Sequence, residues 1–199
     1  MIEALIAELP NPERLSREQR RGIIARYTSV LEGNFIYWMT ATYIAVKSEE
    51  ARPLLTHNLY EECRDSHPHM LRKFAIAAHA FPTDTDALSV NDELTQVRLF
   101  LGKLQGVQSV LTMAFFEGWI QRFMAYLADL AKAQGSSEFE YTDVHGVLDV
   151  EHSQELFRAL EMESAANPIS PDADLFEGVD ILRTLIQVMI DGPAPLAAA

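Results

Sequence analysis

The sequence predicts an all-α protein, a single-domain bundle of about seven helices. Between helix-breaking residues, apolar side chains recur about every 3.6 residues, the repeat of an α-helix, and not every second residue as in a strand. Clusters of β-branched residues, which are typical of strands, are missing. With 199 residues, 48% of them hydrophobic, the chain can form one sizeable core but is too short for two ordinary domains. We therefore expect residues 1–199 to form one domain.

The predicted helices follow one another between recognisable breaks. Pro10 and Pro12 end a short first helix within the N-terminal segment 1–12. Ser16, followed by acidic and amide side chains, is typical of a helix start, and the helical pattern continues to about residue 46 with a weak point at Gly33. Further helices are expected over residues 48–63, 68–81, 91–103, 107–130, 141–164 and 172–190, with a loop over 84–89 and a frayed tail over 192–199.

Charge and composition exclude several classes of protein. The chain has 16 Lys and Arg against 29 Asp and Glu, a formal net charge of −13, whereas proteins that bind nucleic acids or anionic membranes need clustered positive charge. The single cysteine, Cys63, cannot form an internal disulfide, so we expect a reducing, cytoplasmic location. The first residues carry an acid where a signal peptide carries basic residues, and no apolar run approaches the roughly 20 residues of a membrane span.

One predicted helix carries His145, Asp149 and His152. At 100° per residue, positions i, i+4 and i+7 lie within roughly 60° of one another, so the three side chains share one helical face. Two imidazoles beside a carboxylate suit a borderline divalent metal ion. The alternative is an ordinary solvated polar face.

Glu117 is a second candidate, because it lies in the middle of the most apolar predicted helix, 107–130. An unpaired ionised carboxylate in a core would cost several kcal/mol, so the side chain must be protonated, paired or bound to a metal ion. Arg122, a nearby cation, does not share its helical face.

The third candidate region runs from Asn58 through the acidic pair Glu61 and Glu62 to His67 and His69. Pro68 interrupts the helix here, and we expect it to place His67 at a helix N-cap with its side chain free to turn inward. The acidic pair can equally be a solvated turn.

Together these regions offer three carboxylates and three imidazoles on separate helices. Helical bundles build dinuclear carboxylate sites in this way. Three carboxylates against two divalent ions leave a net charge near +1, and ligation by oxygen and nitrogen without thiolate favours iron or manganese over structural zinc.

The arrangement resembles the haem-oxygenase-like diiron oxidases, also described as iron-containing redox enzymes. The family pattern is an Asn-containing helix that ends in an acidic pair, a His that opens a helix, a Glu in an apolar helix, and a His-x-x-x-Asp-x-x-His helix. The matching segments lie within residues 15–160. By this resemblance the fold is haem-oxygenase-like and the metal ligands are Glu62, His67, Glu117, His145, Asp149 and His152. Because relatives often have a longer loop before their histidine, His69 is the alternative to His67.

The resemblance implies a non-haem diiron oxidase or oxygenase that activates dioxygen to oxidise a small organic substrate. The substrate is an amine, amino acid or carboxylic acid, and the reaction is N-oxygenation or oxidative C–C cleavage, in a biosynthetic pathway. Two iron ions are expected, with manganese as a possible substitute and without haem, together with an electron donor. A homodimer is possible. Tyr37, Trp38 and Tyr43 are candidates to line the pocket.

Two other functions remain open from the sequence. Thiaminase-like hydrolases of the same fold use a cysteine nucleophile with a glutamate, and Cys63 stands beside Glu62. That reaction leaves the shared face of His145 and His152 unexplained. The other possibility is a non-catalytic helical binding module in which the histidines are incidental.

Overall fold

The computed structural model describes residues 1–192, except the side chains of Leu148 and Asp149. This part of the chain contains ten α-helices, one short 3-10 helix and no strand, which confirms the all-α prediction, although the expected number of helices was too low. The elements are α1 (Ile2–Ala7), η1 (Pro12–Arg14), α2 (Arg17–Leu31), α3 (Phe35–Ala45), α4 (Arg52–Arg64), α5 (His67–Ala77), α6 (Asp84–Leu88), α7 (Asn91–Leu101), α8 (Gly106–Ala133), α9 (Glu140–Ala166) and α10 (Glu177–Asp191).

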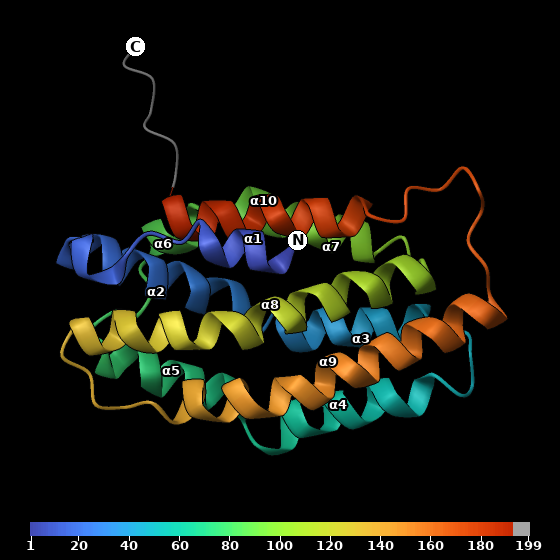
Figure 1. Cartoon of the computed structure of the whole chain (residues 1–199), viewed down its shortest axis with the longest axis horizontal. Coiled ribbons are helices and arrows are strands. Elements are labelled where there is room, and N and C mark those ends of the chain that lie inside the picture. The colour runs from blue at the N-terminus through green and yellow to red at the C-terminus, as the bar shows by residue number, and fades with distance from the viewer. Residues whose placement is uncertain (193–199) are drawn as a thin grey trace, which may run out of the picture.

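The two longest helices, α8 and α9, form an antiparallel pair along the length of the molecule (Figure 1). Helices α2 and α3 pack beside α8, while α4 and α5 pack against α9, and α7 and α10 lie on the opposite long side. Helix α8 is surrounded by these neighbours, so its side chains are buried on most of its circumference. This explains the unbroken apolar run from which a central helix was predicted.

Local predictions differ from the structure at three places. The helix expected up to residue 46 is divided into α2 and α3 at Gly33, the predicted weak point, because this residue takes a left-handed conformation at φ 79°. The loop expected over 84–89 contains α6, which begins with a reciprocal capping box between Thr83 and Asp86. The last helix begins at Glu177 and not near residue 172, because the Asp174 side chain accepts the backbone N–H of Phe176 and forms a turn.

Arg26 of α2 holds the end of α10. Its Nε donates to the carbonyl oxygen of Met189 at 2.8 Å and its Nη2 to that of Ile190 at 3.0 Å. A cation at a helix C-terminus satisfies carbonyl groups that have no partner within the helix. From residue 193 on, the tail that was predicted to be frayed lies outside the described residues.

No helix in the described part of the chain combines the length and apolar character that crossing a lipid bilayer requires.

Candidate metal centre

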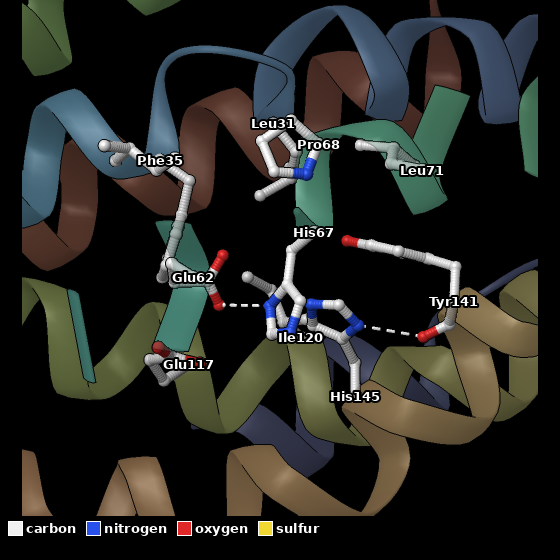
Figure 2. Close-up of a pocket in the computed structure, with 11 residues that line it drawn as sticks. Leu31, Phe35, Glu62, His67, Pro68, Leu71, Glu117, Ile120, Tyr141 and His145 are labelled. Carbon is white, nitrogen blue, oxygen red and sulfur yellow. Dashed lines mark hydrogen bonds and ion pairs between the residues drawn. The ribbon is translucent and has the colours of Figure 1, made fainter. Parts of the chain in front are cut away.

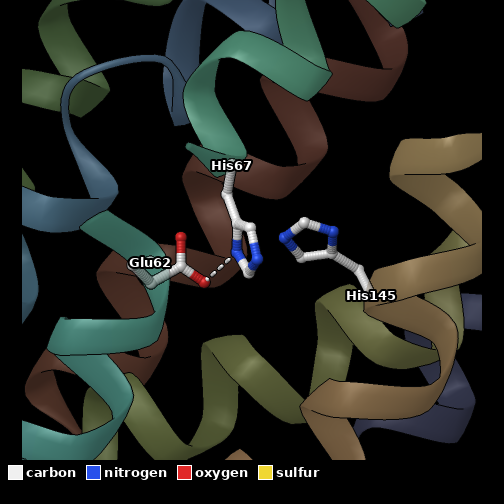
Figure 3. Close-up of side chains that lie close together, drawn as sticks. All are labelled: Glu62, His67 and His145. Carbon is white, nitrogen blue, oxygen red and sulfur yellow. Dashed lines mark hydrogen bonds and ion pairs between the residues drawn. The ribbon is translucent and has the colours of Figure 1, made fainter. Parts of the chain in front are cut away.

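The junction of α4 and α5 brings Glu62 and His67 together (Figure 3). Ser66 between the two helices is left-handed at φ 56° and caps α5, so His67 is the first helical residue and Pro68 the second, not the cap and N1 as the sequence suggested. Both side chains are buried, and Nδ1 of His67 lies 2.8 Å from Oε1 of Glu62. A sharp turn, and not a shared helical face, therefore joins these two residues.

His145 of α9 completes a three-residue cluster with Glu62 and His67. Each of the three offers one ligand atom, and these atoms all lie within 4.8 Å of one another. The rings of His67 and His145 approach to 4.5 Å between centroids at an angle of 64° (Figure 3). Oxygen and nitrogen atoms at such separations can share one divalent ion.

Hydrogen bonding around the two imidazoles favours metal binding. Nδ1 of His145 donates to the backbone carbonyl of Tyr141 at 2.8 Å, so the lone pair of the neutral ring is on Nε2 (Figure 2). Nε2 of His67 is buried and meets no hydrogen-bond partner within the described residues. A buried nitrogen without a hydrogen-bond partner destabilises the folded state, and coordination to a metal ion would offset this cost. The residues present therefore fit a metal site.

Burial keeps His145 in the form that binds metals. Removal from water, together with the neighbouring His67 and His152, lowers the pKa of His145 to about 4 against the opposing charge of Glu62. At neutral pH the ring is uncharged, as a metal ligand must be.

Glu117 of α8 is only 1% exposed, which confirms the expected burial of this carboxylate. Asn58 of α4 donates to Glu117 Oε1 at 3.3 Å, whereas Arg122 pairs with Glu3 on the surface. Burial and the nearby charge of Glu62 raise the pKa of Glu117 well above its ordinary value. Burial therefore favours the protonated acid, whereas a divalent cation would favour the ionised form.

His152 of α9 lies between carboxylates of α4 and α8. Its Nε2 is 2.8 Å from Oε2 of Glu61, and its Nδ1 is 4.0 Å from Oε1 of Glu117. The hydrogen bond from His152 lowers the pKa of Glu61, which is therefore ionised at neutral pH. The remaining predicted ligand, Asp149, has a side chain outside the described part of the structure, so its role stays a prediction.

A small cavity opens onto the cluster of Glu62, His67 and His145 and onto Glu117 (Figure 2). Its volume is about 20 Å³, which is room for about one water molecule or one ion. The polar part of its lining is Glu62, His67, Glu117 and His145, and the remainder is Leu31, Phe35, Ile36, Pro68, Leu71, Ile120 and Tyr141.

Other candidates from the sequence lie elsewhere. His69, the alternative to His67, is exposed. Cys63 is also exposed and is not among the residues that line the cavity. Tyr37 and Tyr43 are largely exposed and Trp38 is buried, and the cavity uses Phe35 and Tyr141 in their place.

No separate role was predicted for Tyr141, Asn58 or Glu61, although Asn58 and Glu61 lie in the third candidate region of the sequence. Tyr141 precedes His145 by four residues, the spacing at which a ring nitrogen can reach a backbone carbonyl of the same helix. Its hydroxyl is anchored by that of Tyr27 at 2.8 Å. The contacts of Asn58 and Glu61 join different helices, so residue spacing within one helix does not predict them.

Comparisons with known proteins identify the family of the chain. The sequence model of one protein family, described as iron-containing redox enzyme, matches residues 24–180, which include every predicted ligand. No curated protein and no solved structure matches the chain.

Proposed function

The chain belongs to the family of iron-containing redox enzymes, and from this premise we propose that it is a non-haem diiron oxidase or oxygenase. It would use dioxygen and an electron donor to oxidise a small organic substrate in the cytoplasm. The observation that carries this proposal is the convergence of buried carboxylates and imidazoles from α4, α5, α8 and α9 around one cavity. Family membership supports iron and redox chemistry, and the donor set supports a site for more than one ion.

We divide the predicted ligands between two ions. Glu62, His67 and His145 would hold the first, because they form one compact cluster. Glu117 and His152 would hold the second ion together with Asp149. The spacing of Asp149 and His152 in the sequence puts these two residues on one face of their helix. Iron bound there supplies the electron transfer and the activation of dioxygen, and manganese can be tested in its place.

The protein's own residues hold the ions, exclude water and orient the substrate. The apolar walls that Leu31, Phe35 and Leu71 contribute keep bulk water from the ligands (Figure 2). Tyr141 and Glu61 hold the rings of His145 and His152 through their second nitrogens. For the substrate we propose an amine, an amino acid or a carboxylic acid, oxidised at nitrogen or cleaved at a C–C bond.

An anaerobic titration with Fe(II) tests the proposal. We expect two iron ions per chain, and a change in the visible spectrum when dioxygen is admitted. His67→Ala and Asp149→Ala should each lower the iron stoichiometry. His69→Ala is the matched control, because this exposed histidine lies two residues from His67 and should leave the stoichiometry unchanged.

A chain that takes up no iron would refute the proposal. Equal losses in His67→Ala and His69→Ala would refute the assignment of His67.

A further inference from the structure

The imidazole of His152 is held through one nitrogen by a carboxylate that the ligand set does not include. Nε2 of His152 lies 2.8 Å from Oε2 of Glu61, and the ring is 1% exposed. Its other nitrogen, Nδ1, is the one nearer Glu117, at 4.0 Å from Oε1. The ring thus spans the space between the end of α4 and the middle of α8.

Glu61 lies at the edge of the site, with 19% of its side chain exposed. While Oε2 faces His152, Oε1 lies 3.7 Å from the guanidinium of Arg64 and 3.9 Å from Nε2 of His57. The guanidinium of Arg64 pairs with a carboxylate, which accepts hydrogen bonds and donates none. Nε2 of His152 must therefore carry the ring proton in this contact.

A neutral imidazole that is protonated at Nε2 has its lone pair on Nδ1. His145, seven residues earlier in α9, is held in the complementary way, since its Nδ1 donates to the carbonyl of Tyr141. Each histidine of α9 thus gives one nitrogen to an outer acceptor and turns the other towards the buried carboxylates. Outer acceptors of this kind fix the tautomer and the orientation of metal-bound histidines.

We propose that Glu61 is the positioning residue of the second metal site: it fixes His152 in the tautomer that offers Nδ1 to an ion shared with Glu117. The proposal rests on the proposed function, because it assigns Glu61 a task in the same diiron site. The tautomer of His152 can also be tested in the metal-free protein.

Nitrogen NMR of the metal-free full chain, labelled with ¹⁵N-histidine, reads the tautomer directly. Wild-type protein should show His152 protonated at Nε2, assigned by the signals lost in His152→Gln. Glu61→Ala should lose this preference, whereas Glu61→Gln should retain it, because the amide carbonyl still accepts the hydrogen bond. Glu155→Ala is the control, since Glu155 contacts His57 at 3.1 Å on the same outer side.

Titration with Fe(II) then separates a positioning role from direct ligation. Loss of an outer acceptor typically costs about 10–100-fold in metal affinity, so Glu61→Ala should weaken binding of the second ion by about that factor. Glu61→Gln should stay close to wild type, and Glu155→Ala should not differ from it. A Glu61→Gln variant as impaired as Glu61→Ala would overturn the proposal in favour of direct ligation.

A wild-type His152 protonated at Nδ1 would also overturn it. If the chain takes up no iron, the proposed function fails together with the iron part of this proposal. The NMR result still decides whether Glu61 fixes the ring, so the two failures remain distinguishable.

Discussion

The protonation of His145 should make the metal-free protein sensitive to acid. The ring is 5% exposed, and burial lowers its pKa to about 4 from the ordinary value of about 6.5. Between these two pH values the unfolded chain binds a proton that the folded chain does not. The free energy of unfolding therefore falls as the pH drops from about 6.5 towards 4. At about 1.4 kcal/mol per pKa unit, the loss attributable to His145 is about 3 kcal/mol at pH 4.

Urea unfolding with EDTA, followed by tryptophan fluorescence, measures this loss. Trp38 and Trp119 are both fully buried, so their emission reports the loss of the core. Between pH 7.5 and pH 4, wild-type protein should lose about 3 kcal/mol more than His145→Gln, which cannot take up the proton. His79→Gln, at an exposed histidine, is the control and should follow wild type. Parallel curves for wild type and His145→Gln would refute the argument.

The next predictions concern burial, reactivity and packing. Burial raises the pKa of Glu117, so the folded chain keeps a proton that the unfolded chain releases, and stability falls as the pH rises above about 4.3. Glu117→Gln should therefore show a smaller fall in Tm between pH 5 and pH 8, and a smaller rise in Tm with Fe(II) because one ligand of the second ion is lost; a fall as large as in wild type would contradict this. Cys63→Ser should keep wild-type iron uptake, because the thiol is exposed and does not line the cavity, and a loss would show that the thiol contributes to iron binding. Gly106→Ala should lose about 1–3 kcal/mol in urea unfolding, since its Cβ would lie 2.3 Å from Oε1 of Glu163, and an unchanged midpoint would show that Glu163 moves aside.

The sequence predicted the helical class and the family correctly, because both depend on patterns that are local or repeated along the chain. The 3.6-residue periodicity needs no knowledge of tertiary contacts. The start of α2 at Ser16 follows from a capping box, whose two hydrogen bonds are both present. The short helix α6 was missed because a capping box over 83–86 was interpreted as a loop. The extent of the domain stays a prediction.

Within the site, the local part of the geometry was the predictable part. His145 and His152 are seven residues apart on one helix, so the backbone alone directs both side chains to similar azimuths. The burial of Glu117 likewise followed from its apolar neighbours in α8. The assignment of all six ligands stays a prediction, and for Asp149 it rests on sequence alone.

Tertiary structure decided which of several equivalent side chains face the cavity. Glu61 and Glu62 are adjacent in α4 and therefore point about 100° apart, so Glu62 meets His67 of α5 while Glu61 meets His152 of α9. The left-handed turn at Ser66 directs His67 inward and leaves His69 exposed. By itself the sequence determined the helical class, the candidate metal ligands and the family. The pairing of those side chains required the packing of α4, α5, α8 and α9, because contacts between helices depend on distances that no spacing along the chain encodes.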